Sequence, residues 1–394
     1  MNGKNIALGA FILMSTICYG QNLEFSGYFE NQLFPQKIGN EWKITDYNKL
    51  RLNLNSEISE KVSFSANYIY KTYHGNTSFN MIDFMPGRLV NSYASFLGVN
   101  QDSLRPLFEI EQKDENFLDN AYVTIYTKLF TIRVGKQQLP WGSGYTWNPT
   151  DIFHDKNMTD PTYEKVGVNA FKLDVAISNE GSITGIISVS DDWKKTTKAI
   201  KFHDVWGNFD FSVSAVEKYQ EEIDFFTFQP ANERRRMIGT DFSTELLGLG
   251  LWGEAAFNIM DESENYGQYL LGVDYTFENG LYITGEYYRN ELGKTNKVDY
   301  KLSDWMRLFG NQGTNLGRDY LFLGQSYPVA ELLNWSNYSI INLSDGSLIL
   351  FPWVSYDLND NTDVSFVGYL PIGEEETEFG EFGAGGFARI RVYF

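Results

Sequence analysis

Residues 49–70 read KLRLNLNSEISEKVSFSANYIY, and the pattern of this stretch decides the fold. Apolar and polar residues alternate from Leu50 to Ile58, and they alternate again from Val62 to Tyr70 after a short polar turn. Successive side chains of a β-strand point to opposite faces, so alternation over about ten residues indicates a strand with one apolar and one polar face. The stretch therefore predicts two antiparallel strands joined by a short turn.

The same alternation recurs on both sides of this hairpin and predicts eighteen strands in all. Their expected ranges are 23–32, 48–58, 62–71, 117–128, 130–138, 166–178, 181–190, 196–203, 207–219, 234–245, 248–259, 266–277, 280–291, 320–327, 332–343, 347–357, 362–371 and 383–394. The pattern is weakest in 196–203 and 320–327, which leaves sixteen strands as an alternative. Either number is even, as in most bacterial outer-membrane barrels.

The links between the expected strands fall into two length classes. Short links rich in Gly, Asn, Asp and Glu alternate with longer ones at 33–47, 72–117, 139–165, 220–233 and 292–319. Transmembrane barrels have short periplasmic turns and long extracellular loops, whereas a soluble β-sandwich would not sort its links by length. The sequence therefore predicts an all-β protein, a transmembrane antiparallel β-barrel with short periplasmic turns and long extracellular loops.

Composition excludes several other classes of protein. Aromatic residues make up 16% of the 394 residues, yet charged residues are 21%, the net charge is −19 and only one cysteine is present. A helical membrane protein needs runs of about 20 apolar residues, which are missing here. Strong negative charge disfavours nucleic-acid binding, and a single cysteine excludes a disulfide framework or a cysteine-based zinc site.

The first residues indicate export from the cytoplasm. Lys4 is followed by an apolar stretch, Ile6 to Met14, and then by a small-residue segment that ends at Gly20. This arrangement is typical of a secretory signal peptide, so we expect residues 1–20 to be removed and 21–394 to form one barrel domain in the outer membrane of a Gram-negative cell. A lipoprotein signal acylated on Cys18 is the alternative.

The last residues carry a second signal. The chain ends in Phe394, with apolar residues at every second position before it. Such an ending is similar to the C-terminal strand that the outer-membrane assembly machinery recognises, so we expect that machinery to be a partner. An ordinary edge strand that ends in Phe is the alternative.

A motif in the middle of the chain resembles a known family. Residues 133–153 read RVGKQQLPWGSGYTWNPTDIF, which is similar to a stretch in large porin-like outer-membrane barrels, including the alginate-export-like group. The matching residues are Gly135, Lys136, Gln137, Trp141, Gly142, Asn148, Pro149 and Asp151. The resemblance implies a barrel that passes or exports solutes, but it names no substrate, and Lys136 stands where Arg is commoner. The segment is interpreted either as a rigid structured loop or as a loop folded into the lumen.

Polar faces of the strands are expected to line the interior, since the apolar faces meet lipid. The candidate lumen-lining residues are Arg51, Glu57, Arg133, Lys172, Asp174, Glu254, Asp274, Glu286, Arg389 and Arg391. Opposed charges in a lumen favour hydrophilic solutes over apolar ones. We hypothesise that Arg51, Arg389 and Arg391 form a locally positive wall suited to small hydrophilic or anionic solutes; the alternative is that these charges pair across strands and only stabilise the wall.

Two loops bear on access to the interior. The longest, 72–117, is rich in apolar residues and is expected to pack inward or over the mouth. Residues 301–309 are expected to form one or two helical turns with Ser303 as the N-cap. Three consecutive arginines, 234–236, either meet phosphates of lipid or lipopolysaccharide at the outer rim or form a plain charged loop end.

The predicted function is a porin-like channel for passive passage of hydrophilic solutes. The alternative is a barrel that acts as an adhesin or an assembly factor through its outer loops. An outer-membrane hydrolase using Ser143 and His154 is a third possibility, although their spacing predicts no catalytic geometry. No cofactor is predicted, and the three histidines do not form a spaced metal-binding pair.

Overall fold

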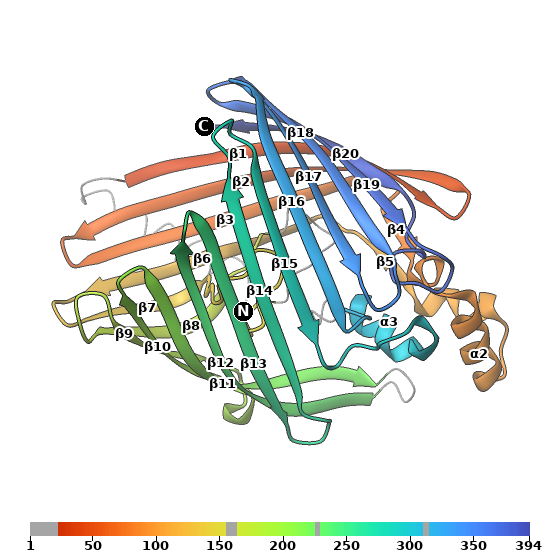
Figure 1. The fold of residues 1–394 in the computed structure, drawn as a ribbon, viewed down its shortest axis with the longest axis horizontal. Coiled ribbons are helices and arrows are strands. Elements are labelled where there is room, and N and C mark those ends of the chain that lie inside the picture. Colours follow the sequence, from red (N-terminus) through yellow and green to blue (C-terminus); the bar gives the residue numbers. More distant parts are fainter. Residues whose placement is uncertain (1–22, 155–163, 225–228, 310–314) are drawn as a thin grey trace, which may run out of the picture.

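The computed structural model describes residues 23–154, 164–224, 229–309 and 315–394. The predicted signal peptide, 1–20, and its alternative at Cys18 lie outside the described residues. Eighteen strands form one sheet in which every neighbouring pair is antiparallel (Figure 1). The sheet closes on itself, because β1 pairs with β20 as well as with β2.

All eighteen predicted strands are present, so the sixteen-strand alternative is wrong. The strands of the barrel are β1 (Leu23–Ile38), β2 (Glu41–Ser59), β3 (Val62–Gly75), β6 (Glu115–Tyr126), β7 (Phe130–Gln137), β8 (Val168–Ala176), β9 (Ser182–Ser188), β10 (Thr197–Trp206), β11 (Phe209–Asp224), β12 (Gln229–Leu246), β13 (Leu249–Met260), β14 (Tyr266–Thr276), β15 (Tyr282–Asn290), β16 (Asp319–Ala330), β17 (Leu333–Asn342), β18 (Leu348–Asn359), β19 (Thr362–Ile372) and β20 (Gly385–Tyr393).

The two faces of the wall differ as the alternation requires. On β1, Phe25, Phe29 and Leu33 are exposed on the outer face, whereas Glu30 and Gln32 are buried on the inner face. An outward apolar band is what lets strands cross a bilayer, since a closed barrel satisfies all its backbone hydrogen bonds internally. A chain that is polar on average can therefore still present an apolar surface to lipid.

The connections alternate between the two ends of the barrel. At one end, where both β1 begins and β20 ends, the links contain two to five residues; the other end carries the long loops 76–114, 138–167, 291–318 and 373–384. The segregation of loop lengths is confirmed. The expected long links at 33–47 and 220–233 are wrong. β1 and β2 continue to a tight turn at Gly39 and Asn40. β11 continues to Asp224, and β12 begins at Gln229.

The reason is that these strands extend beyond the apolar band. Beyond the band the outward positions of β1 and β2 include polar residues such as Lys37 and Asp46, so the period-two pattern fades although backbone pairing continues without a break from Leu23–Ser56 to Ile38–Glu41. A positive φ of 60° at Gly39 closes the hairpin, a conformation that glycine adopts without strain.

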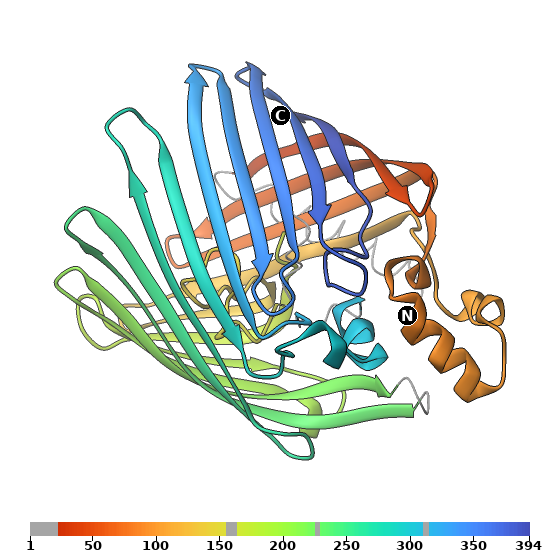
Figure 2. The same cartoon turned by 45° about the vertical axis from the view of Figure 1, so that its right-hand side comes forward.

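The long loops build a small packed unit at the outer end of the barrel. Its elements are β4 (Ser78–Asn80), η1 (Met81–Phe84), α2 (Gly87–Leu97), η2 (Gln101–Ser103), η3 (Arg105–Leu107), β5 (Glu109–Glu111), η5 (Lys297–Asp299) and α3 (Leu302–Phe309); a further turn, η4 (Trp193–Lys195), precedes β10. Figure 2 shows α2 and α3 near each other at this end. Loops 76–114 and 291–318 share one buried cluster, in which Trp305 and Met306 lie with Met85 and Tyr93.

The expected helix at 301–309 is present, but Ser303 is not its N-cap. The helix begins at Leu302, which places Ser303 inside the first turn. The carboxylate of Asp304 instead accepts a hydrogen bond from the backbone N–H of Lys301 at 2.9 Å. Among the described residues, none of the helices has the length and apolar character needed to span a membrane.

Candidate functional site

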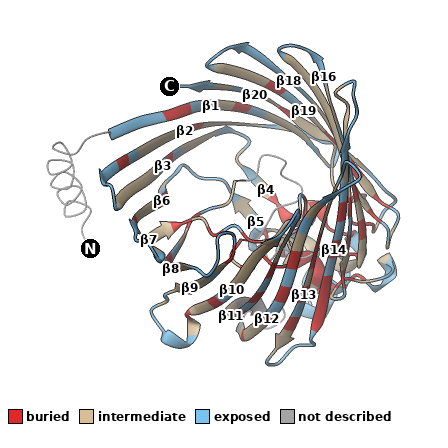
Figure 3. Cartoon of the chain, turned by 60° about the vertical axis from the view of Figure 1, so that its left-hand side comes forward, coloured by how far each residue is buried: buried red, intermediate tan, exposed pale blue. Residues whose placement is uncertain are grey.

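The loop between β7 and β8, residues 138–167, crosses the interior of the barrel. One part of it is hydrogen-bonded to β13 and β15, and another part to β1 and β2. These two groups of strands lie nearly opposite each other in the ring. Figure 3 shows the buried part of this segment running inside the circle of strands. This loop divides the lumen, and the candidate site is the part of the lumen next to it.

Glu254, in the middle of β13, holds the near part of the loop. Its Oε1 accepts hydrogen bonds from the backbone N–H groups of Ser143 and Gly144, both at 2.7 Å. Its Oε2 accepts from the N–H of Thr150 at 3.0 Å and from the Thr150 hydroxyl at 2.8 Å. The Asn148 amide adds a longer contact to Oε1 at 3.3 Å. A single buried carboxylate thus satisfies loop donors that would otherwise be unpaired.

Glu286, on β15, holds the next residues of the same loop. It accepts hydrogen bonds from the N–H groups of Tyr145 and Thr146, the latter at 2.7 Å. It also accepts from the indole N–H of Trp252 at 2.7 Å. Trp147 then stacks on Tyr288 with ring centroids 4.9 Å apart and an interplanar angle of 10°. The loop is fixed both by charge-assisted hydrogen bonds and by aromatic packing.

The glycines of the family-like motif permit this path. Gly142 has a φ of 85°, and a Cβ there would lie 2.5 Å from Oε1 of Glu254. Gly135, within β7, has a φ of 127°, and a Cβ there would lie 2.2 Å from the carbonyl oxygen of Ala121 on β6. A larger residue at either position would displace the backbone or the carboxylate.

The remaining motif residues fix the loop to its surroundings. Gln137 is completely buried and donates to the Ala170 carbonyl at 3.0 Å. Trp141 meets Phe153 edge to face at 5.2 Å, and Asn148 donates to the Gly144 carbonyl at 2.8 Å, with Pro149 following it.

Asp151 closes a turn within the loop. Its carboxylate accepts from the N–H of Phe153 at 3.2 Å and pairs with Lys165 at 2.6 Å. Burial alone would raise the pKa of Asp151, but the neighbouring His154 and Lys165 outweigh it and hold that pKa below its usual range. Lys136 lies with its ammonium 5.7 Å from the ring of Phe117. The described part of the motif loop is hydrogen-bonded to the inner wall and lies in the lumen, as the second of the two interpretations expects.

The far part of the loop reaches the opposite wall through Glu164. Its carboxylate accepts from Lys49 at 2.9 Å, from Arg51 at 3.1 Å and from the Tyr28 hydroxyl at 2.9 Å. Arg391 is 3.9 Å away. Burial alone would raise the pKa of Glu164, but Lys49 and Arg51 outweigh it and lower the pKa below its usual range.

The register explains which of the three hypothesised arginines meet. Arg391 lies opposite Glu30, with which it pairs at 2.5 Å, and Arg51 pairs with Asp119 at 3.3 Å. Arg389 lies one inward position before Arg391 on β20, opposite Gln32 and Ser365, and reaches Asp363 diagonally at 3.7 Å. Glu164 thus brings Arg51 and Arg391 together but not Arg389, and each of the three arginines is near a carboxylate.

The other predicted lumen charges are mostly engaged with near neighbours. Lys172 pairs with Asp174 at 3.0 Å, and Asp274 accepts from a tyrosine hydroxyl on the next strand at 2.9 Å. Arg133 lies over a tyrosine ring of β6, 4.6 Å from its centroid. Glu57 is exposed and, with Arg133, lines a hollow of about 280 Å³ near the short-turn end.

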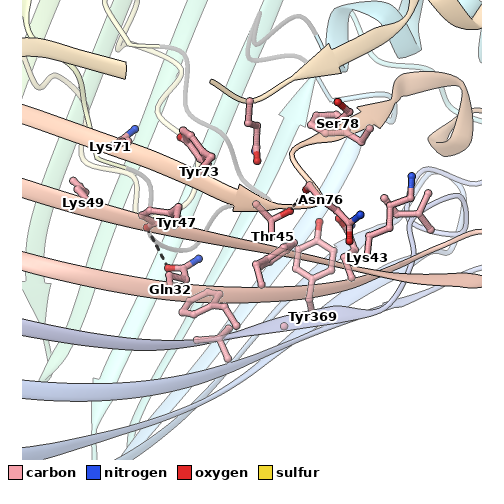
Figure 4. Close-up of a pocket in the computed structure, with 18 of the residues that line it drawn as sticks. Gln32, Lys43, Thr45, Tyr47, Lys49, Lys71, Tyr73, Asn76, Ser78 and Tyr369 are labelled. Atoms are coloured by element: carbon pink, nitrogen blue, oxygen red, sulfur yellow. Dashed lines mark hydrogen bonds between the residues drawn. The ribbon is translucent and has the colours of Figure 1, made fainter. Parts of the chain in front are cut away.

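A larger cavity of about 590 Å³ lies beside the far part of the loop (Figure 4). The inner face of β1–β3 forms one side of it, and residues of the long loops, such as Phe79 and Phe84, form another. Its lining includes three lysines and two acidic residues, together with tyrosines and side-chain amides; the charged residues are Lys43, Lys49, Lys71, Asp119 and Glu164. The expectation that loop 72–117 packs near the mouth agrees with this lining.

The lysines differ in how far they are neutralised. Lys71 pairs with Glu115 at 2.9 Å, and Lys49 pairs with Glu164 at 2.9 Å. Lys43 has no ion pair within the part of the chain that the structure describes. It is half-buried and lies opposite Gln36 near the outer end of the β1–β2 hairpin. Lys43 is therefore the lining cation whose charge is least compensated.

Sequence reasoning named Arg51 but missed Lys49, Lys71 and Glu164. A signal existed for the lysines: Lys49 is two residues before Arg51, and Lys71 continues the polar positions of the run from Val62, so both share the inward face. No comparable signal existed for Glu164, because it belongs to a loop without periodicity and is placed only by the path of that loop.

Ser143 and His154 do not form a catalytic pair. The Ser143 hydroxyl donates to the Gly253 carbonyl at 3.3 Å, and Nδ1 of His154 lies 3.1 Å from Asp151. No contact joins the two side chains among the described residues. Glu254 anchors the loop that contains both residues, so this segment has a structural role.

Phe394 takes part in closing the barrel. Its N–H donates to the Gly27 carbonyl at 3.0 Å, and its carbonyl accepts from the Gly27 N–H at 2.9 Å. Its ring lies 6.2 Å from that of Phe25 on the outer face. That Phe394 also serves as an assembly signal stays a prediction.

Comparison with known proteins places the fold. No protein-family model matches the chain, and no curated protein matches it. Similar solved structures include OccK5 (OpdH) of Pseudomonas aeruginosa, with a TM-score of 0.58 and 9% identity over 95% of this chain and 99% of that one. OccK11 (OpdR) of the same organism has a TM-score of 0.55 and 7% identity over 95% and 96% of the two chains. OccAB4 of Acinetobacter baumannii has a TM-score of 0.54 and 9% identity over 95% and 98%.

These similarities, at low identity, show the fold alone. The chain is a closed eighteen-stranded antiparallel β-barrel of the kind found in outer-membrane porins. The alginate-export-like group is not among the similar structures described above, so that finer resemblance rests on residues 133–153.

Proposed function

We propose that this barrel is an outer-membrane channel for the passive passage of small hydrophilic solutes, with a preference for anions. The observation that carries the proposal is the cavity of about 590 Å³ inside the ring of strands, which lies between the β1–β3 wall and the long loops. Its lining combines lysines with hydroxyl and amide groups. These groups can replace the water molecules that surround a polar solute, so they favour the entry of polar solutes over apolar ones.

The balance of charge in this cavity supports the preference for anions. Of the lining acidic residues, Asp119 pairs with Arg51, and Glu164 is surrounded by Lys49 and Arg51. Lys43 adds a cation nearer the outer end, where an entering solute arrives first. Because low-dielectric walls concentrate a field, one uncompensated cation in a narrow passage biases the local ion concentration more than it would in open solvent.

The experiment compares Lys43→Gln with Lys37→Gln in planar bilayers. Both lysines lie near the outer end of the β1–β2 hairpin, but Lys43 lines the cavity whereas Lys37 is exposed next to the outward Trp42. The reversal potential under a KCl gradient gives the ratio of chloride to potassium permeability. We expect the ratio to fall roughly twofold to fivefold in Lys43→Gln, corresponding to about 0.5–1 kcal/mol for one partly solvated charge.

Lys37→Gln should leave the permeability ratio unchanged. Equal effects of the two substitutions would show that the ratio responds to overall charge and not to the cavity. A wild-type channel that prefers potassium would contradict the proposed preference for anions.

The likeness of residues 133–153 to the alginate-export-like group is consistent with a channel and specifies no solute. The motif residues hold a loop inside the lumen, where Trp141 and Gly142 contribute to its shape. Since the loop narrows the interior, small solutes are the proposed class.

A non-transport role through the outer loops is the second candidate. It is favoured by the packed unit that loops 76–114 and 291–318 form, which has its own buried cluster around Trp305. Liposome swelling distinguishes the two: a channel admits small sugars and amino acids at rates that fall with solute size, whereas a barrel that works only through its loops admits none.

A further inference from the structure

The three consecutive arginines of β12 point to different sides of the barrel wall. Arg235 faces inward, where its Nε donates to the Asn258 side chain at 2.8 Å and its guanidinium lies over the ring of Tyr266. Arg234 and Arg236 have the opposite parity, and Arg236 pairs with Asp261 at 2.8 Å. Two of the three cations are therefore on the outer surface, which is the surface that meets lipid.

A hollow of about 650 Å³ lies on this outer wall, across β8–β13. Its floor follows from the register: Ile200 lies between Gly185 on β9 and Ala215 on β11, and Ala215 lies opposite Ile238 on β12. Gly185 has no side chain and Ala215 has a small one, so they leave a depression between larger neighbours in the apolar wall. Ile200 and Ile238 are exposed at 55% and 56%, which places them on the outer face.

The hollow opens outward and not into the lumen. The residues between its outward side chains, such as Ala199 and Met237, are buried against the inner loop through Leu139 and Trp141. Neither of those loop residues lines the hollow. A volume of this size is within the range of small-molecule sites.

Cations border one end of the hollow. Lys198, Glu217 and Arg236 lie directly opposite one another on β10, β11 and β12, one outward position beyond the apolar floor. Glu217 is the shared anion: Lys198 is 3.2 Å from it, Arg236 is 3.6 Å and Arg234 is 3.8 Å. Three cations around one carboxylate leave positive charge, even with Asp261 beside Arg236.

Arg234 also keeps unused donor capacity. Its Nε is buried and has no hydrogen-bond partner among the described residues. A buried N–H without an acceptor is costly, and a phosphate oxygen would satisfy it. The cluster thus lacks an acceptor that its geometry can accommodate.

The cluster lies at the level expected for lipid headgroups of the outer leaflet. Lys198 is near the start of β10, which follows a link at the long-loop end. Trp193, in that link, is 62% exposed, and the Lys198 ammonium lies 5.2 Å from its ring centroid. Exposed tryptophan marks the boundary between apolar band and headgroups in membrane proteins.

We infer that this outer-wall hollow binds the phosphorylated lipid anchor of lipopolysaccharide. A phosphate lies among Lys198, Arg234 and Arg236, and an acyl chain lies over Ile200 between Gly185 and Ala215. The hollow suits this lipid because it faces the bilayer, combines an apolar floor with a cationic end, and opens at the outer leaflet, which lipopolysaccharide occupies. The inference is independent of whether the lumen conducts.

The test measures lipid binding by the intact barrel in detergent, using the purified phosphorylated lipid anchor and native mass spectrometry. The first variant, Lys198→Gln/Arg234→Gln/Arg236→Gln, removes the cationic end. We expect its affinity for the lipid to fall about 100-fold, since each cation near an anionic lipid surface contributes about fivefold. Arg289→Gln is the matched control, because Arg289 is also paired at the long-loop end of its strand, with Asp319.

The second variant, Ala215→Phe, fills the hollow and leaves every charge in place. Ala215 is exposed on the outer face, so the larger side chain meets no interior group. We expect it to weaken binding of the lipid, while Leu271→Phe, at an exposed position of β14, has no effect. Heat-modifiable migration in gels verifies that each variant is a folded barrel.

Three results would overturn the inference. The first is a triple variant that binds the lipid as tightly as the wild type. The second is an Arg289→Gln variant that weakens binding as much as the triple variant does. A wild-type dimer without lipid that Ala215→Phe converts to monomer would assign the hollow to a second copy of the chain. Loss of lipid in both test variants but in neither control supports the site.

Discussion

Removing the two carboxylates that hold the inner loop should open the lumen. The change is Glu254→Gln together with Glu286→Gln, which keeps side-chain size and replaces one acceptor oxygen of each group by a donor. Each carboxylate oxygen of Glu254 receives at least two loop donors at 3.0 Å or less. An amide nitrogen at either place therefore leaves two donors unpaired.

The magnitude follows from these contacts. An unpaired buried donor costs about 1–3 kcal/mol, so two orphaned donors at Glu254 cost about 2–6 kcal/mol. Glu286 adds about 1–3 kcal/mol at the loop, because each of its oxygens accepts from one loop N–H, that of Tyr145 or that of Thr146. Stacking of Trp147 on Tyr288 opposes release, and an aromatic pair contributes about 0.5–1.5 kcal/mol beyond its buried area. Leu139 and Trp141 stay packed against the wall, so we expect residues 143–150, and not the whole loop, to leave their position for a larger fraction of the time.

Single-channel recording is the assay. We expect larger conductance and added fluctuations on the millisecond scale, together with new protease cleavage between Leu139 and Thr150. Asp274→Asn is the control, since Asp274 faces inward and accepts a hydrogen bond from a hydroxyl of the neighbouring strand and not from the loop. Conductance, noise and cleavage equal to those of the wild type, in a barrel shown to be folded, would refute the assignment of Glu254 and Glu286 as loop anchors.

Two further predictions concern the outer loops. Burial raises the pKa of Glu378, in the β19–β20 loop, to about 7, against 4.5 for an ordinary glutamate. The folded state therefore holds a proton that the unfolded chain releases, so this contribution to stability is full below about pH 4.5 and is lost as pH rises to about 7, a change of about 3 kcal/mol. Protection factors in loop 373–384, which are exchange rates corrected for the intrinsic pH dependence of amide exchange, should be lower at pH 8 than at pH 5, and Glu378→Gln should remove that difference; the same pH dependence of the protection factors in Glu378→Gln would contradict the assignment. Replacing residues 75–112 by a short turn should raise conductance, because Phe79 and Phe84 line the cavity; equal conductance would show that this loop does not restrict the passage.

The strands could be predicted because lipid imposes a pattern on one face. Within the apolar band every second residue from Leu50 to Ile58 must suit lipid, and this constraint alone identified the strand. This constraint does not act beyond the apolar band. The sequence pattern therefore predicts a loop where the outer parts of β1 and β2 continue as strands. The pairing there depends on continued backbone hydrogen bonds, which leave no mark on residue type.

The interior was predicted less completely, for a different reason. Parity places Glu254 and Glu286 on the inward face, but it does not say that a loop supplies their partners. The segment from Gly142 to Thr150 presents backbone donors that need acceptors, and only the assembled barrel brings the carboxylates of β13 and β15 to them. The separation of Arg389 from Arg51 likewise depends on strand register, which sequence pattern fixes to within two residues at best.

The unequal strand lengths give the barrel a rim of unequal height. A strand needs about 9–11 residues to cross a bilayer, whereas β2 has 19 and β12 has 18. The two long hairpins, β1–β2 and β11–β12, therefore extend about 20 Å beyond the membrane surface. Between them β7 and β9 have only 8 and 7 residues, and the loop that would raise this side is folded inside. In the channel proposed above, solutes that diffuse along the cell surface would therefore meet a lower rim on the side of β7 to β9, and would enter from that side before any contact with the lysines of the lumen.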